Sequence, residues 1–328
     1  ANPWRRKHRG DGSATVDGAC RQGPRWSEAV NAVVIDKRTT ERLLTDEPMS
    51  AHTSWRIGGL ADVFYQPVDV KNLAEFLAQQ DPDNEIHWIG LGSNLLVRDG
   101  GIRGVVICTL DLPARIEQLD ERRLKVGAGV PCTVLARQCM RWQLGPSAFF
   151  AGIPGTLGGA LAMNAGAFGG ETWDAVESVE TIDRTGAVRI RDADEFRVAY
   201  RSVEREADEW FLGATLTFER ETGADLSSIS GLLRKRGISQ PLGQRSCGSV
   251  FRNPPGGYAA KLIEAAGLKG ERIGDAVVSE KHANFIINTG SASAANVEDL
   301  IELVRDRVRE DSGVTLTLEV RILGEKFS

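Results

Sequence analysis

The sequence predicts an α+β protein of about two or three domains. Its 328 residues exceed what one small hydrophobic core normally organises. Short segments typical of strands are mixed irregularly with segments typical of helices, and no regular βαβ repeat appears. The composition also changes near residue 222, after which basic and helix-forming residues become frequent. We therefore expect a larger N-terminal part and a separate C-terminal domain.

Hydrophobic periodicity predicts the individual elements. Apolar residues at helical spacing indicate helices over 70–78, 134–142, 227–236, 258–266 and 297–309. Short apolar or alternating runs indicate strands over 86–89, 105–107, 124–126, 178–183, 188–190, 213–218, 285–287 and 316–323. The helix over 297–309 has the clearest pattern, because Val297, Leu300, Ile301, Val304 and Val308 share one face.

The N-terminal segment differs from the rest of the chain. Residues 1–29 are polar, basic and rich in glycine, and we expect them to form a disordered arm. No apolar segment follows the basic run at 5–9, so we expect no secretory signal and a cytoplasmic protein. No run approaches the ~20 apolar residues that span a bilayer, so we expect no membrane insertion.

Charge and residue counts exclude several function classes. The formal net charge is −5, which argues against a dedicated nucleic-acid binder. The five cysteines are scattered without a C-x-x-C pair, which is typical of free thiols in a reducing compartment. The four histidines lack the spacing of a metal site, so no metal is expected. These features leave a metal-free protein of the cytoplasm, which we expect to be a monomer.

A first glycine-rich turn follows the strand over 86–89. Gly90 and Gly92 allow successive backbone N–H groups to face one concavity, and Ser93 and Asn94 add side-chain donors, a pattern suited to a pyrophosphate. The third glycine and the following helix of a Rossmann site are absent, which excludes that fold. Taken alone, the turn also fits a purely structural role without a ligand.

A second, longer glycine-rich block covers 152–170. Its low side-chain bulk lets a flat aromatic ligand lie directly on the backbone, and Gly158 and Gly159 are placed to begin a helix whose N-terminus favours negative charge. Packing alone does not account for so long a stretch without bulk. The candidate ligand-contacting residues are Gly152, Ile153, Pro154, Gly155, Gly158, Gly159, Asn164, Gly166 and Ala167.

Together, the segments 90–94 and 153–164 resemble the FAD-binding domain of the vanillyl-alcohol oxidase and p-cresol methylhydroxylase superfamily. The resemblance implies non-covalent FAD held between two α+β subdomains, over 30–110 and 111–222. It also implies a flavin contact from Thr53 in an opening loop over 52–59. The superfamily leaves the reaction open, and an FAD-dependent oxidase or dehydrogenase of a hydroxy acid or sugar is one alternative.

The C-terminal third narrows the reaction. Segments 246–254, 260–270, 278–285 and 318–324 resemble those of UDP-N-acetylenolpyruvoylglucosamine reductases. The resemblance covers about residues 30–325, and the extra tyrosine-bearing loop of the longer class of that family is absent. It implies NADPH-dependent reduction of UDP-N-acetylglucosamine enolpyruvate to UDP-N-acetylmuramate through FAD, in peptidoglycan precursor synthesis. A substrate domain is expected over 223–315, with a final strand in 316–328 returning toward the FAD domains.

The resemblance also implies catalytic roles. Ser249 would donate a proton, Arg201 would hold the substrate carboxylate, and Glu319 would hydrogen-bond the negative charge that develops there. Each residue also has a plain structural reading: a turn residue, a surface arginine and a solvated strand residue, respectively. Cys247 precedes Gly248 but has no partner histidine in the pattern, so we do not expect it to act as a nucleophile.

Five further positions are expected to bind the substrate. They are Tyr200, Gln240, Asn253, Arg252 and Arg321, the two arginines offsetting diphosphate charge. The chain departs from the family at His52, where asparagine is usual, and at Ser239, which aligns with a substrate lysine of the longer class. Besides the oxidase alternative, a non-catalytic flavoprotein or nucleotide-sugar binding module would also fit the glycine blocks.

Overall fold

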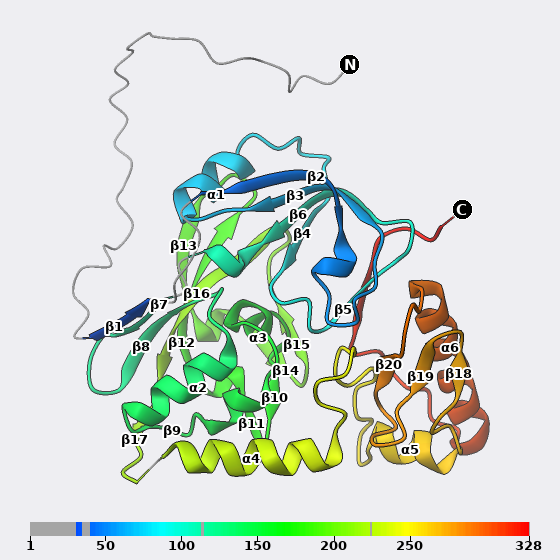
Figure 1. The fold of residues 1–328 in the computed structure, drawn as a ribbon. Coiled ribbons are helices and arrows are strands. Elements are labelled where there is room, and N and C mark those ends of the chain that lie inside the picture. Colours follow the sequence, from blue (N-terminus) through cyan, green and yellow to red (C-terminus); the bar gives the residue numbers. More distant parts are fainter. Residues whose placement is uncertain (1–30, 35–39, 113–114, 224, 328) are drawn as a thin grey trace.

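The computed structural model describes residues 31–34, 40–112, 115–223 and 225–327 (Figure 1). The expected N-terminal arm, residues 1–29, lies outside the described residues. No helix within the described part of the chain is long and apolar enough to cross a membrane. Within the same residues, no group of three or more His, Cys, Asp or Glu side chains could hold a metal ion.

A four-stranded sheet forms the first part of the fold. Its strand order is β2-β3-β6-β4, with β2 antiparallel to β3 and the other neighbours parallel. The strands are β2 (Arg42–Pro48), β3 (Leu60–Gln66), β6 (Ile102–Cys108) and β4 (Ile86–Ile89). Helix α1 (Val70–Leu77) is capped by the Asp69 carboxylate and buries Leu73 and Leu77. The parallel β4 and β6 end at the same edge, so the turn after β4 faces the rest of the molecule.

A six-stranded antiparallel sheet forms the second part. Its order is β1-β7-β8-β16-β12-β13. The strands are β1 (Asn31–Val34), β7 (Arg115–Gln118), β8 (Arg123–Gly127), β16 (Glu209–Thr217), β12 (Val176–Asp183) and β13 (Val188–Asp192). Strand β1 therefore pairs inside the second sheet, although the sequence alone assigns 30–110 to the first subdomain. Backbone pairing with β7, which periodicity cannot reveal, decides its place.

Two helices and three short ribbons complete this part. Helices α2 (Cys132–Arg141) and α3 (Leu157–Met163) bury apolar residues in one core with β8, β12 and β16. The ribbons are β9 (Leu144–Gly145) with β17 (Glu219–Arg220), β10 (Gly166–Ala167) with β11 (Gly170–Glu171), and β14 (Arg197–Ala199) with β15 (Ser202–Glu204). Helix α3 carries Gly158 and Gly159 of the second glycine-rich block, and its N-cap Thr156 packs against Gly90 of the turn after β4.

Helix α4 (Leu226–Ser239) leads from this part to the C-terminal domain along one side of the molecule (Figure 1). The C-terminal domain packs α5 (Ala259–Ala265) and α6 (Ala294–Ser312) with a small sheet, and the two helices share a core. The sheet contains β18 (Arg272–Ile273), β19 (Ala276–Val278) and β20 (Ile286–Asn288). Trp55 of the first part is fully buried in the same core, which ties the two parts together.

The last crossing of the chain returns to the first part. Only Arg321–Leu323 forms a strand, β21, which pairs in parallel with β5 (Leu95–Val97). The strand expected over 316–323 is thus shorter than predicted. Its first residues pass between domains with one bridge, from Leu318 to Phe251, and no continuous partner strand. The crossing places Glu319 between the C-terminal domain and the turn after β4.

Candidate active site

A cavity of about 580 Å³ lies where the three parts meet. Its lining comes from the turn after β4, the second glycine-rich block, helix α4, the loop over 247–249 and the final crossing. The sequence-predicted residues that line it are Gly90, Gly92, Ser93, Asn94, Gly152, Ile153, Pro154, Gly155, Gly158, Gly159, Gly166, Ala167, Arg201, Gln240, Ser249, Glu319 and Arg321. Five predicted residues are outside the lining: Thr53, Asn164, Tyr200, Arg252 and Asn253.

The turn after β4 requires glycine because neighbouring backbone is very close. Gly92 has a φ of +59°, and a Cβ there would lie 2.0 Å from the His52 carbonyl oxygen. The Gly92 carbonyl also accepts a hydrogen bond from the Ser54 N–H at 3.1 Å. A Cβ at Gly90 would lie 2.5 Å from the Thr156 hydroxyl. Bare backbone therefore forms this wall of the cavity.

The second block presents bare backbone from the opposite side. The Gly158 N–H donates to the Ala128 carbonyl at 2.9 Å. A Cβ at Gly158 would lie 2.9 Å from the Ala128 Cβ, so glycine is needed here for close packing against Ala128. Gly159 differs, because a Cβ there would meet only the Thr156 hydroxyl, at 4.0 Å. Gly159 therefore leaves open space on the cavity side, where a flat group can approach the helix backbone.

The cavity wall also holds polar atoms that lack a partner. The Thr156 hydroxyl and the Trp88 indole N–H are buried and make no hydrogen bond within the described residues. Both side chains line the cavity. A buried polar atom without a partner costs about 1–3 kcal/mol, so these two sites favour a polar ligand. Together with the glycine walls, they fit FAD, which offers aromatic rings, hydroxyls and phosphates.

Thr53 and Asn164 support the walls without lining them. The Thr53 hydroxyl donates to the Ile57 carbonyl at 2.7 Å and closes the opening loop on itself. Asn164 ends α3 in the left-handed conformation with a φ of +46°. Its amide donates to the Glu171 carboxylate at 2.7 Å and accepts from the Trp173 N–H at 3.1 Å. Both residues hold glycine-bearing segments in place.

Arg201 is fixed by three hydrogen bonds. Its Nε donates to Glu319 Oε1 at 3.1 Å, and its two Nη atoms donate to the carbonyls of Asn164 and Gly166 at 3.2 and 3.0 Å. The residue itself has a φ of +55° in the turn between β14 and β15. The neighbouring Tyr200 ring lies 5.0 Å from the guanidinium carbon and is 44% exposed. Arg201 therefore faces the cavity, and Tyr200 faces outward.

Glu319 is held by its own backbone as well as by Arg201. Its N–H donates to the Val250 carbonyl at 2.8 Å, and its carbonyl accepts from the Asn94 amide at 3.0 Å. Burial raises the pKa of the Glu319 carboxyl, and the opposing charges of Arg201 and Arg252 offset only part of that rise. Glu319 therefore retains a proton at higher pH than a surface glutamate does.

Ser249 reaches the same cavity from the C-terminal domain. Gly248, just before it, has a φ of +84°, a conformation that suits glycine. Because Val250 accepts the Glu319 N–H, the loop carrying Ser249 lies directly beside Glu319. Cys247 also lines the cavity and is fully buried. Burial first, and the charge of Glu319 second, raise the pKa of its thiol, which makes it a poor nucleophile.

Arg252 and Asn253 lie outside the cavity lining. The Asn253 amide oxygen accepts from the Ala259 N–H at 3.2 Å at the start of α5. The Arg252 N–H donates to the Thr317 carbonyl at 2.8 Å, while its buried side-chain Nε has no partner within the described residues. Arg252 affects the site through its positive charge, which lowers the pKa of Glu319.

Helix α4 contributes cavity residues that the sequence reading passed over. Lys235 and Arg236 both line the cavity beside Ser239 and Gln240. The Arg236 guanidinium donates to the Gly152 carbonyl and to the Gln240 amide oxygen, and no carboxylate within the described residues pairs with it. Burial lowers the pKa of Arg236. The basic character of 227–236 is the sequence signal that could have identified them.

The two departures from the family pattern have different surroundings. His52 lies outside the cavity lining, 2.8 Å from Glu47 and stacked on Phe64 with ring centroids 4.2 Å apart. Ser239 lines the cavity at the end of α4, and its hydroxyl donates to the Arg236 carbonyl at 3.3 Å. The basic residues next to Ser239 therefore supply the positive charge on this side.

Two family models match the chain. One, described as the C-terminal domain of UDP-N-acetylenolpyruvoylglucosamine reductase, matches residues 240–323. The other, described as an FAD binding domain, matches residues 61–191. The cavity lies between these two matched regions, since it takes lining residues from both.

Curated proteins and a solved structure are also similar. A UDP-N-acetylenolpyruvoylglucosamine reductase of Alkalilimnicola ehrlichii is 55% identical over 86% of this chain and 95% of its own length. The corresponding protein of Methylococcus capsulatus is 53% identical over 86% of this chain and 93% of its own length. A crystal structure of the reductase from Thermus caldophilus is 30% identical, with a TM-score of 0.73, over 87% of this chain and 99% of that one.

Proposed function

This chain belongs to the UDP-N-acetylenolpyruvoylglucosamine reductase family, and from that premise we propose a role for each side chain around its cavity. The protein is an FAD-dependent oxidoreductase of peptidoglycan precursor synthesis, with NADPH as the hydride donor. It reduces UDP-N-acetylglucosamine enolpyruvate to UDP-N-acetylmuramate. The observation that carries our assignment of roles is the convergence of Ser249, Arg201 and Glu319 on one cavity.

The substrate sets the chemical requirements. Reducing its enolpyruvyl ether adds a hydride to the terminal carbon and a proton to the carbon that bears the oxygen and the carboxylate. Negative charge develops on the carboxylate between the two additions. FAD, when bound, supplies the hydride chemistry. The chain itself must hold the substrate, stabilise that charge and deliver the proton.

Arg201 and Glu319 serve the developing charge. The guanidinium is always charged and planar, and its bonds to the Asn164 and Gly166 carbonyls fix it before the substrate arrives. Prior positioning of this kind avoids reorganisation during the reaction. Glu319, whose pKa is raised, can donate a hydrogen bond to the substrate carboxylate in its protonated form.

Ser249 donates the proton. A hydroxyl is a weak acid, so it serves only because the accepting carbon is strongly basic once the hydride has been added. The alkoxide that remains recovers its proton from water. Gly248 places no side chain beside Ser249, and its φ of +84° gives the loop a turn that most other residues would strain.

The remaining roles concern binding. FAD lies along Gly90, Gly92, Ser93, Asn94 and the block over 152–167, with Thr53 and Asn164 holding these walls. Gln240 and Arg321 bind the UDP-sugar inside the cavity, and Lys235 and Arg236 add charge for its diphosphate. Tyr200, Arg252 and Asn253 act where the substrate extends past the cavity.

We assign residues 30–110 and 111–222 to the two FAD-binding subdomains and 223–315 to the substrate domain, which closes on the flavin. Residues 316–328 return toward the FAD-binding subdomains. A single cavity shared by NADPH and the UDP-sugar predicts ping-pong kinetics, because each must leave before the other enters. A cytoplasmic monomer completes the proposal.

Anaerobic flavin spectroscopy tests this function. NADPH is expected to bleach the yellow absorbance, and UDP-N-acetylglucosamine enolpyruvate is expected to restore it with formation of UDP-N-acetylmuramate. Recovery only with oxygen would favour the oxidase alternative. A protein without flavin and without affinity for FAD would contradict both.

A further inference from the structure

One arginine of the cavity belongs to none of the roles above. Arg205 lies in the loop between β15 and β16 and lines both the main cavity and an adjoining hollow. Trp210 of β16 lines both spaces together with Arg205, and Trp88 of β4 lines the main cavity beside Trp210. The two tryptophan rings stack with centroids 5.0 Å apart and 13° between their planes. This end of the cavity is therefore walled by aromatic rings and carries a cation.

Arg205 has no carboxylate within ion-pair distance in the described part of the chain. Its guanidinium donates to the Glu209 backbone carbonyl, which takes up one of its five N–H groups. Burial lowers the pKa of Arg205, and the like charge of Arg321 lowers it further, while the opposite charges of Glu209 and Asp208 offset part of that fall. Two cations at one partly buried place repel each other unless an anion joins them.

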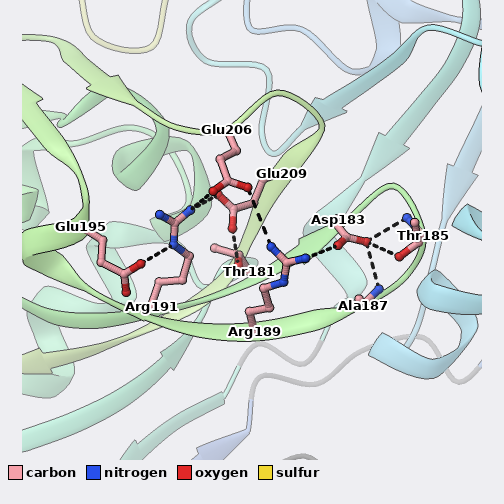
Figure 2. A network of polar contacts seen from close by, with 9 residues as sticks. All are labelled: Thr181, Asp183, Thr185, Ala187, Arg189, Arg191, Glu195, Glu206 and Glu209. Carbon is pink, nitrogen blue, oxygen red and sulfur yellow. Dashed lines mark hydrogen bonds and ion pairs between the residues drawn. The ribbon is translucent and has the colours of Figure 1, made fainter.

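The acidic neighbours of Arg205 in the chain are held elsewhere. Glu209 is buried, and its carboxylate accepts from Arg191 at 2.8 Å and from the Thr181 hydroxyl at 2.8 Å. The Glu206 carboxylate lies 3.6 Å from the same Arg191 guanidinium. Figure 2 shows the Arg191 guanidinium paired with both of these carboxylates on one side and with Glu195 on the other.

The remaining acids of this loop follow the same pattern. Asp208 pairs with Arg184 at 3.1 Å, and Glu204 pairs with Arg197 at 3.8 Å. Each carboxylate in 204–209 therefore has an arginine partner other than Arg205. The loop presents its single cation to the cavity. Its acids form ion pairs with other arginines, although Glu204, Glu206 and Asp208 line the adjoining hollow together with Arg205.

We propose that Arg205 binds a phosphate group of a dinucleotide at the end of the cavity walled by Trp88 and Trp210, and that Arg191 is the positioning residue that keeps Glu206 from neutralising it. The inference rests on the proposed function, since both FAD and NADPH are dinucleotides. A guanidinium suits a phosphate because its N–H groups form paired, charge-assisted hydrogen bonds. The flanking aromatic rings suit the base or sugar next to that phosphate.

The first test compares Arg205→Gln with Arg307→Gln, which removes an exposed arginine of α6 outside the cavity lining. FAD release is followed by flavin fluorescence on dilution of the holoenzyme. NADPH binding is followed by the concentration dependence of anaerobic flavin reduction, with NADH in parallel. Losing one charge-assisted contact is expected to weaken the affected dinucleotide on the order of 10- to 100-fold. The control variant is expected to match the wild type.

The two arms distinguish the source of the phosphate. Weaker FAD retention assigns Arg205 to a phosphate of the bound flavin. Unchanged FAD retention with a higher NADPH requirement and a reduced preference over NADH assigns it to the 2′-phosphate of NADPH. Unchanged behaviour in both arms overturns the proposal. That last result would leave the reductase function intact, because flavin reoxidation by the UDP-sugar is scored separately.

The second test addresses Arg191. Arg191→Gln removes one of the two arginine partners of Glu206 and leaves only Arg189, at 3.8 Å. The Glu206 side chain is 63% exposed, so it has room to turn toward Arg205. We expect it to weaken the same dinucleotide as Arg205→Gln does, and we expect Arg191→Gln with Glu206→Gln to restore binding. A purely structural role of Arg191 predicts a lower melting temperature without such rescue, and that result would overturn the positioning role.

Discussion

The Arg201 guanidinium and the Glu319 carboxylate form an ion pair of 3.1 Å between residues 118 positions apart in the chain. Both side chains are mostly buried, with 15% and 13% of their area exposed. The pair joins the turn between β14 and β15 to the final crossing. Even so, the pKa of Glu319 stays raised, so burial outweighs the attraction of its partner.

This balance predicts a pH-dependent effect of Glu319→Gln on stability. A carboxyl whose folded-state pKa is raised contributes stability that is fully present below its ordinary pKa and is lost as pH rises through the folded-state pKa. The glutamine variant lacks that loss. Its free energy of unfolding, relative to wild type, should therefore increase as pH rises from acidic values to neutrality. Denaturant unfolding at a series of pH values measures this, with exposed Glu310→Gln as the control. A difference independent of pH would contradict the expectation.

Ser249→Ala should separate the two half-reactions. Flavin reduction by NADPH requires no proton from Ser249 and should keep its rate. Reoxidation by the UDP-sugar should slow by about 10²- to 10⁴-fold, the usual contribution of a positioned acid. Stopped-flow absorbance measures both steps, and Ser246→Ala, in the same loop but outside the cavity lining, is the matched control. Equal reoxidation rates in the two variants would exclude Ser249 as the proton donor.

Thr156→Val should weaken FAD binding without weakening the fold. The hydroxyl is buried and has no partner within the described residues, so valine of the same shape removes nothing that the protein itself uses. The loss of one hydrogen bond to FAD, about 1 kcal/mol, corresponds to roughly a fivefold higher dissociation constant.

Thr172→Val is the control for Thr156→Val, and we expect it to lower stability without changing FAD binding. The Thr172 hydroxyl donates to the Ala165 carbonyl at 2.7 Å and does not line the cavity. That variant should lose about 1 kcal/mol of unfolding free energy and keep its FAD affinity. If Thr156→Val retained FAD as firmly as the wild type, the hydroxyl would have no role toward the flavin.

Gly92→Ala should cost more stability than Gly243→Ala. Both glycines have positive φ, which costs an alanine roughly 1–2 kcal/mol. Only at Gly92 would the new Cβ also lie 2.0 Å from a backbone oxygen, while nothing lies within 4 Å at Gly243. Chemical denaturation and the flavin content of the purified proteins measure the difference. Similar losses in the two variants would show that the opening loop moves aside at little cost.

Local sequence patterns predicted helices and strands well where the spacing of apolar residues matches the buried face of the element. The helix expected over 297–309 is present as α6, extended to Ala294–Ser312. Its true start is set by Ser293, whose hydroxyl accepts the Asn296 N–H, and its end by Gly313 at a φ of +73°. The strand expected over 316–323 was too long, because Leu316 and Leu318 are apolar where they pack on the core that contains α5 and α6, and not as part of a continuous ladder.

Some residues of the candidate site could likewise be recognised from the sequence, and others could not. The glycine turns could be recognised from sequence because positive φ and close backbone approach leave glycine as the only residue that fits, as at Gly92. The role proposed for Arg205 could not be recognised, because it depends on the arginines that pair with its acidic neighbours, Arg191 on β13 and Arg184 in the turn before it. Arg236 had a weak signal in its basic helix but required the position of α4 against Gly152.

By itself the sequence determined the family, the two glycine walls and the side chains proposed for catalysis, because these follow from local backbone constraints and residue chemistry. Only the tertiary structure decided which charges meet. It paired Arg201 with Glu319, gave β1 to the second sheet and left Thr53 and Asn164 behind the cavity walls. Contacts between distant segments depend on packing and on competition among hydrogen-bond partners, and a linear pattern does not encode the outcome of that competition.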